Sequence, residues 1–147
     1  MADKNKEHER LHQELHQRSA ELQYMEEHFN KLSSHYKEYE NKIVDIAAIK
    51  ESIDDIKKQE VGSEILVPLA NGIFIKAKLS EKDNFLVNVG SDVVVRKDSE
   101  QAKILLDEQA KEINTYKENI YQQMINISEQ IRNVETDIRN LQKNHDH

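Results

Sequence analysis

The sequence contains no cysteine and no tryptophan, and it has only one proline and three glycines among its 147 residues. Without cysteine it can form neither disulfides nor thiolate-ligated metal sites, which fits a reducing compartment. The scarcity of glycine and proline argues against the loops on which enzymes commonly carry their active sites. Aromatic residues make up 5% and charged residues 33% of the chain, a balance typical of long solvated helices rather than of a compact core.

Long apolar runs and dense basic clusters are missing as well. No stretch approaches the roughly 18 apolar residues of a membrane span, and the polar N-terminus has no signal-peptide core. A net charge of −7 disfavours nucleic acid, because binding phosphates requires clustered lysine and arginine. We therefore expect a cytoplasmic protein that binds neither nucleic acid nor membrane.

Catalytic motifs are also absent. The sequence has no phosphate-binding loop, no dinucleotide-binding glycine motif and no HExxH zinc motif. Its many aspartates and glutamates fall on the solvated faces of predicted helices, where no water-excluding pocket would tune them for acid–base catalysis. We therefore expect neither an enzyme nor a bound cofactor.

The seven histidines are the one hint of a metal site. His8, His12 and His16 recur every four residues and so share a helix face, and His145 and His147 are expected near them. Such a row could bind metal or respond to pH. The alternative is polar filling of an exposed helix end, which needs no fixed partner. We favour that alternative and predict no metal site.

What the sequence does contain is two long heptad runs, one toward each end. Their core residues alternate between spacings of three and four, which indicates helices that bury one narrow stripe against a partner helix. The core positions of the first run are His8, Leu11, Leu15, Arg18, Leu22, Met25, Phe29, Leu32, Tyr36, Tyr39, Ile43 and Ile46. Those of the second are Leu106, Ala110, Ile113, Lys117, Ile120, Met124, Ile127, Ile131, Val134, Ile138 and Leu141.

The first helix is expected from about His8 to Lys58, after a frayed segment at 1–7. Ile49 would follow Ile46 after an extra three-residue step, which overwinds a coiled coil locally. Arg18 places a charge in the stripe, as Lys117 does in the second run, and a charge at such a position helps to fix the register at some cost in stability.

The second helix is expected to begin at a capping box and to run to about Asn144. Asp98 or Ser99 is the predicted cap, with Gln101 placed to complete the box. The chain thus divides into an N-terminal coiled-coil helix at 1–58, a β block at 59–98 and a C-terminal coiled-coil helix at 99–147.

The β block is predicted to form two hairpins. Asn71-Gly72 is a strong tight-turn signal within the first. Isolated hairpins are marginal in water, so these strands are expected to pair with strands of other chains. The residues predicted to carry this assembly are Ile65, Val67, Leu69, Ile73, Phe74, Ile75, Phe85, Val87, Val89, Val93 and Val95.

The simplest fold is α+β: a long antiparallel two-helix coiled coil with a central pair of β-hairpins that join an oligomeric β-barrel. Both termini then meet at one end, here called the tip. The last turns of a two-helix coil fray, so their apolar residues become available to a ligand. The candidates are Leu11, Leu15, Val134, Ile138 and Leu141. The plainer alternative, that these residues only complete the coiled coil, remains open.

Two segments of the β block resemble a known family. Ile65-Leu-Val-Pro-Leu-Ala-Asn-Gly-Ile-Phe-Ile-Lys-Ala77 is similar to the first hairpin of prefoldin α subunits, and Phe85-Leu-Val-Asn-Val-Gly-Ser-Asp-Val-Val-Val95 is similar to the second. The flanking helices extend the resemblance over nearly the whole chain. Four strands rather than two point to the α class.

The resemblance implies a subunit of a hexamer with two α and four β-type subunits, in which the hairpins build a β-barrel body. It implies an ATP-independent holdase whose coiled-coil tips bind non-native polypeptides and pass them to a group II chaperonin. The histidines at both ends make this tip more polar than a strongly apolar clasp. The rival function is a structural coiled-coil scaffold or filament former. An RNA-binding helical arm is a third possibility, and the acidic charge counts against it.

Overall fold

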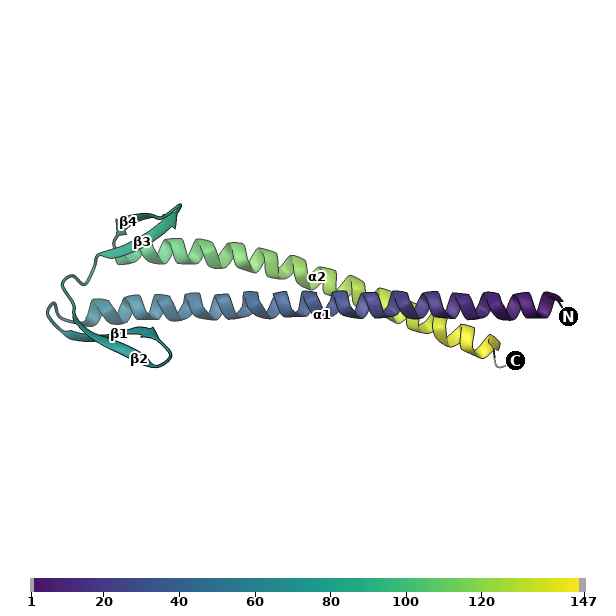
Figure 1. Cartoon of the computed structure of the whole chain (residues 1–147). Coiled ribbons are helices and arrows are strands. Elements are labelled where there is room, and N and C mark those ends of the chain that lie inside the picture. The colour runs from purple at the N-terminus through teal and green to yellow at the C-terminus, as the bar shows by residue number, and fades with distance from the viewer. Residues whose placement is uncertain (1, 146–147) are drawn as a thin grey trace. The chain divides into compact units, whose positions relative to one another are not determined.

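The computed structural model describes residues 2–145, with two long helices at the ends of the chain and four strands between them (Figure 1). The elements are α1 (Ala2–Lys58), β1 (Glu64–Ala70), β2 (Ile73–Lys78), β3 (Phe85–Gly90), β4 (Val93–Lys97) and α2 (Ser99–His145). The structure divides into two compact units. The terminal unit comprises the residues up to Glu40 and those from Thr115 onward, and the central unit comprises Asn41–Asn114.

Helix α1 begins earlier than the sequence suggested. It includes Ala2 and the residues that follow, so the predicted start near His8 is wrong. No glycine or proline interrupts this segment, and Asp3 in the first turn places a negative charge at the positive end of the helix dipole. At the other end α1 stops at Lys58, as predicted, and Gly62 follows with a φ of 93°, a value that favours glycine.

In the terminal unit the predicted stripes of both helices are half-buried or buried. The exception is His8, which is exposed and lies outside the stripe, so its assignment as a core position was wrong. Arg18 contacts Asp137, and Tyr36 contacts Tyr121. The partner number falls as the first number rises, so the two helices run antiparallel within this unit.

The central unit shows the same antiparallel pairing. Lys50 Nζ donates to Asp107 Oδ1, and Lys103 Nζ donates to Asp54 Oδ1. The expected extra step at Ile49 is wrong, because Ile49 is 48% exposed while Lys50 is half-buried. The heptad spacing therefore continues undisturbed from Ile46 through Lys50, whose ammonium group reaches a carboxylate on the facing helix.

Helix α2 begins at two carboxylate caps. Asp98 Oδ1 accepts a hydrogen bond from Gln101 N at 2.8 Å, and Gln101 Oε1 accepts one from Asp98 N at 3.2 Å. This is the predicted capping box, with Asp98 as the cap. Asp83 Oδ1 accepts a further hydrogen bond from Ser99 N at 3.0 Å. This hydrogen bond joins the segment before β3 to the start of α2. Ser99 is only 2% exposed, so solvent hardly reaches it.

The four strands form two separate antiparallel sheets, β1 with β2 and β3 with β4. Each hairpin turns through two residues with positive φ, Asn71-Gly72 in the first and Ser91-Asp92 in the second. Turns of this kind match the natural twist of the paired strands. Within residues 2–145 these sheets close no barrel, so the expected barrel would need strands from other chains.

The second hairpin repeats the first at an offset of 20 residues. Val67 lies opposite Ile75 and Val87 lies opposite Val95. The register shifts between Pro68 and Ala70 in one hairpin and between Asn88 and Gly90 in the other, again 20 residues later. The two sheets are therefore geometrically equivalent copies of one structural unit.

Candidate binding surfaces

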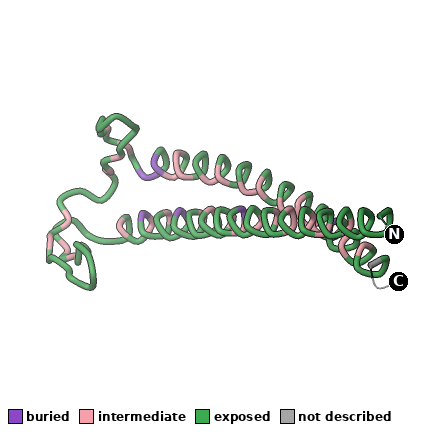
Figure 2. Tube along the Cα trace, turned by 45° about the vertical axis from the view of Figure 1, so that its right-hand side comes forward, coloured by how far each residue is buried: buried purple, intermediate pink, exposed green. Residues whose placement is uncertain are grey.

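The exposed apolar residues of the two hairpins form the first candidate surface, here called the hairpin surface. In Figure 2 the hairpin trace is almost entirely exposed. Of the residues predicted to carry assembly, those that are exposed are Val67, Leu69, Ile73, Phe74, Ile75, Val89 and Val93, and those that are half-buried are Ile65, Phe85, Val87 and Val95. Leu66, Leu86 and Val94 on the opposite faces are exposed too. So much exposed apolar surface is unusual for a single chain and makes the hairpins a candidate surface for contact with another chain.

The half-buried residues of β3 face the helices of their own unit. Phe85 and Val87 line a groove of about 290 Å³ together with Ile49, Leu105 and Leu106. Ile49 is therefore turned toward β3, which explains why it leaves the coiled-coil stripe. On β1 and β2, by contrast, most of the apolar side chains contact no helix closely enough to be covered.

The candidate tip residues lie at one end of the terminal unit. Leu11, Leu15, Ile138 and Leu141 are half-buried, and Val134 is buried at 5% exposure. The Arg18–Asp137 contact places the turn of α1 that contains Leu15 beside the turn of α2 that contains Leu141. The last turns therefore hold apolar side chains that solvent reaches in part, whereas Val134 lies fully within the helix interface.

The histidine row lies on the exposed face of α1. His8, His12 and His16 are all exposed, and among the side chains that the structure describes no three potential ligands are close enough to hold a metal ion. The side chain of His145 and the whole of His147 lie outside the described residues. The predicted grouping of the five histidines is therefore not seen in the described part of the chain.

Aromatic residues and one lysine pack together near one end of the terminal unit. The rings of Tyr36 and Tyr121 lie 6.1 Å apart, and those of Tyr39 and Tyr116 also lie 6.1 Å apart. Lys117 Nζ lies 5.1 Å from the centre of the Tyr36 ring and 3.8 Å from Glu40 Oε1. A cation over a ring and beside a carboxylate is attracted to both. These contacts explain how a charge is accommodated in the apolar stripe.

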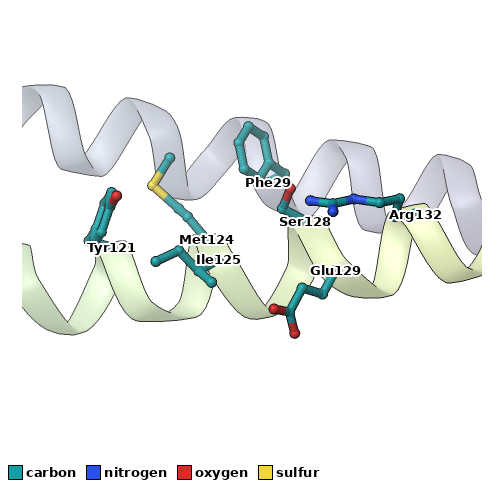
Figure 3. A pocket seen from close by; sticks show the side chains of 7 residues that line it. All are labelled: Phe29, Tyr121, Met124, Ile125, Ser128, Glu129 and Arg132. Carbon is teal, nitrogen blue, oxygen red and sulfur yellow. The ribbon is translucent and has the colours of Figure 1, made fainter.

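A groove opens on one flank of the terminal unit, and it was not predicted from the sequence. This flank groove has a volume of about 280 Å³ and is lined by Phe29, Tyr121, Met124, Ile125, Ser128, Glu129 and Arg132 (Figure 3). Phe29 and Met124 belong to the predicted stripe. Tyr121, Ile125 and Ser128 follow one another at spacings of four and three along α2, a pattern that marks a second, adjoining face of the helix.

Two carboxylates in the central unit have perturbed pKa values, and both are structural. The hydrogen bond from the Ser99 backbone lowers the pKa of Asp83, with smaller help from the Ser99 hydroxyl and the charge of Lys57. The hydrogen bond from Lys103 lowers the pKa of Asp54, with further help from nearby lysine charges. Asp83 caps α2 and Asp54 bridges the two helices, and these contacts account for both lowered pKa values.

Comparison with known protein families adds to this arrangement of helices and hairpins. A family model described as "Prefoldin subunit" matches residues 25–144. This chain belongs to the prefoldin family. Proteins of the prefoldin family are chaperones, with long coiled-coil helices. None of the described helices combines the length and apolar character that crossing a membrane requires.

Several curated prefoldin subunits are similar to this chain. Prefoldin subunit alpha from Pyrococcus horikoshii is 31% identical over 113 residues, which cover 76% of this chain and 72% of that protein. Probable prefoldin subunit 5 from Caenorhabditis elegans is 30% identical over 100 residues, covering 68% and 61%. Prefoldin subunit alpha from Methanococcus maripaludis is 32% identical over 73 residues, covering 50% and 51%. The alignments thus span about half of the third protein and under two thirds of the second.

A solved structure shares the fold. It is the cryo-EM structure of a filamentous PFD from Methanocaldococcus jannaschii, with a TM-score of 0.72 and 15% sequence identity, covering 80% of this chain and 98% of that chain. At this identity the likeness concerns the fold alone. It confirms the predicted prefoldin architecture of two long helices and two intervening hairpins.

Proposed function

We propose that this prefoldin chain is an ATP-independent holdase subunit that binds non-native polypeptides at its coiled-coil tip and delivers them to a group II chaperonin in the cytoplasm. The observation that carries the proposal is the set of half-buried apolar side chains at the tip, Leu11, Leu15, Ile138 and Leu141. Unfolded chains expose apolar residues, and covering these side chains supplies the driving force for holding. The absence of any nucleotide-binding motif supports independence from ATP.

The hairpin surface is assigned to assembly. We propose that it pairs with β-type prefoldin subunits in a closed hexamer of two α and four β subunits. The support is the apolar surface that the hairpins expose, including Ile75 at 51%, together with strand edges that have no partner within the chain. Under this proposal residues 59–98 carry assembly, and the two helices carry the binding of clients.

The tip is tested with the double variant Leu15→Ser and Ile138→Ser in the assembled protein. Both residues are already partly solvated, so the variant should assemble normally and melt close to wild type. It should lose most of the ability to suppress aggregation of a diluted, denatured protein, measured by light scattering without nucleotide. The matched control is Glu14→Ser with Arg139→Ser, two exposed neighbours on the same helices.

Full suppression by the tip variant would place the holding surface elsewhere. A variant lacking residues 1–15 and 137–147 extends the test, and it should lose suppression more completely. Delivery is tested separately, by asking whether a bound labelled client moves to an added group II chaperonin without ATP. Retention of the client on the prefoldin would contradict that step.

A filament-forming function is the second candidate, and one observation favours it. The structural neighbour from Methanocaldococcus jannaschii is described as filamentous. Equivalent hairpins with free edges can stack without limit if no ring closes. Size-exclusion chromatography of the chain alone and with a β-type partner separates the two functions. A defined hexamer with the partner supports the holdase, whereas open polymers under both conditions would support the filament.

A further inference from the structure

We propose that the flank groove of the terminal unit is a second client-binding site, selective for a large apolar residue that lies two positions from an acidic one. This inference rests on the proposed holdase function and names a class of segment that it would prefer. The occupant is thus a stretch of non-native polypeptide in extended form, with Phe-x-Asp as its simplest example.

The floor of the groove is apolar and adaptable. Phe29 and Met124 are half-buried in the helix interface, while Tyr121 and Ile125 are 49% and 37% exposed at the rim. The groove has a volume of about 280 Å³, whereas one water molecule occupies roughly 30 Å³. The groove therefore has room for much more than a single water molecule. An unbranched methionine can adjust to side chains of different shape, which suits a site that meets many sequences.

The charge at one end of the groove supplies the selectivity. In Figure 3 the Arg132 side chain extends along the groove toward Ser128, whereas the carboxylate of Glu129 points away from it. Within the part of the chain that the structure describes, no carboxylate forms an ion pair with Arg132. A guanidinium presents a planar fork of donors that fits a carboxylate better than an ammonium does. An acidic residue of the client would therefore complete this end of the site.

The geometry sets the spacing between the two client residues. Ser128 lies three residues beyond Ile125, or about 4.5 Å along a helix that rises about 1.5 Å per residue. In an extended strand, residues i and i+2 lie on the same face, about 7 Å apart. Among positions on one face of a strand, i and i+2 come nearest to the separation between Ile125 and the Arg132 fork near Ser128. The apolar and the acidic residue of the client are therefore assigned to positions i and i+2.

The test compares two fluorescent 12-residue peptides that differ at one position, Phe-x-Asp against Phe-x-Lys in a Ser/Gly background. Binding to the assembled protein is measured by fluorescence anisotropy. Wild type should prefer the Asp peptide. Arg132→Glu should weaken that peptide about fivefold and shift the preference to the Lys peptide, as charge reversal at a partly exposed pair allows. Ile125→Ser should weaken both peptides alike.

The matched control is Arg139→Glu. Arg139 is an exposed arginine one heptad farther along α2, so its reversal changes the net charge equally but lies outside the groove. It should leave the preference unchanged. Equal effects of Arg132→Glu and Arg139→Glu would overturn the proposal, because the selectivity would then follow the overall charge. Circular dichroism establishes that each variant keeps its helices.

A cross-linking experiment gives an independent readout. The chain has no cysteine, so Ser128→Cys introduces a unique thiol in the groove. The peptide is Phe-x-Asp with a neighbouring cysteine activated as a mixed disulfide with thionitrobenzoate. The introduced thiolate attacks the peptide sulfur, forms the protein–peptide disulfide and releases thionitrobenzoate. This exchange should be at least several times faster for Ser128→Cys than for Gln130→Cys, which lies on the other flank. Equal rates at the two positions would overturn the groove as a binding site.

Failure of the holdase function looks different from failure of this site. If wild type suppresses aggregation but binds both peptides equally, the groove proposal falls and the holdase stands. If wild type neither suppresses aggregation nor binds either peptide, both proposals fall together.

Discussion

Leu32 and Val44 lie twelve residues apart on α1, yet their surroundings are opposite. Leu32 is 8% exposed in the helix interface, whereas Val44 is 65% exposed outside it. The heptad spacing separates these two residues without any knowledge of the structure. It also identified Arg18 and Lys117 as charges within the stripe. Their partners, Asp137 and Glu40, could not be predicted, because they lie on the other helix and depend on the register.

This contrast leads to a stability prediction. Leu32→Ala should lower the free energy of unfolding by about 2–4 kcal/mol, because it removes buried apolar volume and leaves a cavity. Val44→Ala should change it by no more than about 0.5 kcal/mol, since its side chain is already solvated. Denaturation by urea, followed by circular dichroism, measures both. Similar losses for the two variants would contradict the coiled-coil assignment of Leu32.

A second prediction concerns acid. The pKa values of Asp83 and Asp54 are lowered in the folded chain by hydrogen bonds from Ser99 and Lys103. A lowered pKa stabilises the fold at any pH above the unfolded value of about 3.9, and this stabilisation is lost as the pH falls through the folded value. The contribution of these two groups to the free energy of unfolding should therefore be constant between about pH 5 and 7. It should decrease progressively below about pH 4.

The variant Asp54→Asn with Asp83→Asn tests this expectation. It should be less stable than wild type at pH 7, and the difference should shrink as the pH approaches 3. Urea denaturation at a series of pH values measures this difference in the free energy of unfolding. Asp55→Asn serves as the control, because Asp55 is exposed beside Asp54. A difference that grows toward low pH would have the wrong sign for the proposed hydrogen bonds.

At the scale of elements, one cap of α2 could be predicted from the sequence and the other could not. The capping box of Asp98 and Gln101 spans three residues, so the sequence contains all of its parts. The second cap, Asp83, lies 16 residues before Ser99 in the chain, and no local pattern connects them. Ile49 was misplaced for a related reason, because it lines a groove with Phe85 and Val87 of β3, residues that no local pattern connects with it.

The hairpins give the prediction that belongs to this scale. Ile75→Asp should prevent assembly while far-UV circular dichroism stays largely helical. Ile75 is half-exposed in the single chain, so its loss should affect contacts between chains more than packing within one. A charge buried without a partner at such an interface costs several kcal/mol.

Val61→Asp is the matched control for assembly. Val61 is an exposed valine between α1 and β1, outside the hairpins. Size-exclusion chromatography with a β-type partner should show a wild-type oligomer for Val61→Asp and smaller species for Ile75→Asp. A wild-type elution volume for both would remove Ile75 from the assembly surface.

At the scale of the whole molecule, the sequence predicted the order helix, two hairpins, helix, and the prefoldin family. The order was predictable because heptads and tight turns are local patterns, whereas the family was predicted from the resemblance of the two hairpin segments to prefoldin α subunits. The flank groove was missed because it needs Phe29 of α1 beside Met124 and Ile125 of α2. Such a site becomes visible only when the register of the two helices is known.

The 20-residue repeat of the hairpins has a consequence for how tightly a partner is held. Under the proposed assembly, one chain offers two equivalent docking units, so it is bivalent. Once the first hairpin is docked, the second meets its partner at the high effective concentration set by the short connection, here the residues between Lys78 and Phe85. The two hairpins together then bind the partner much more tightly than either hairpin alone. Losing one hairpin would accordingly shorten the lifetime of the complex far more than it would slow its formation.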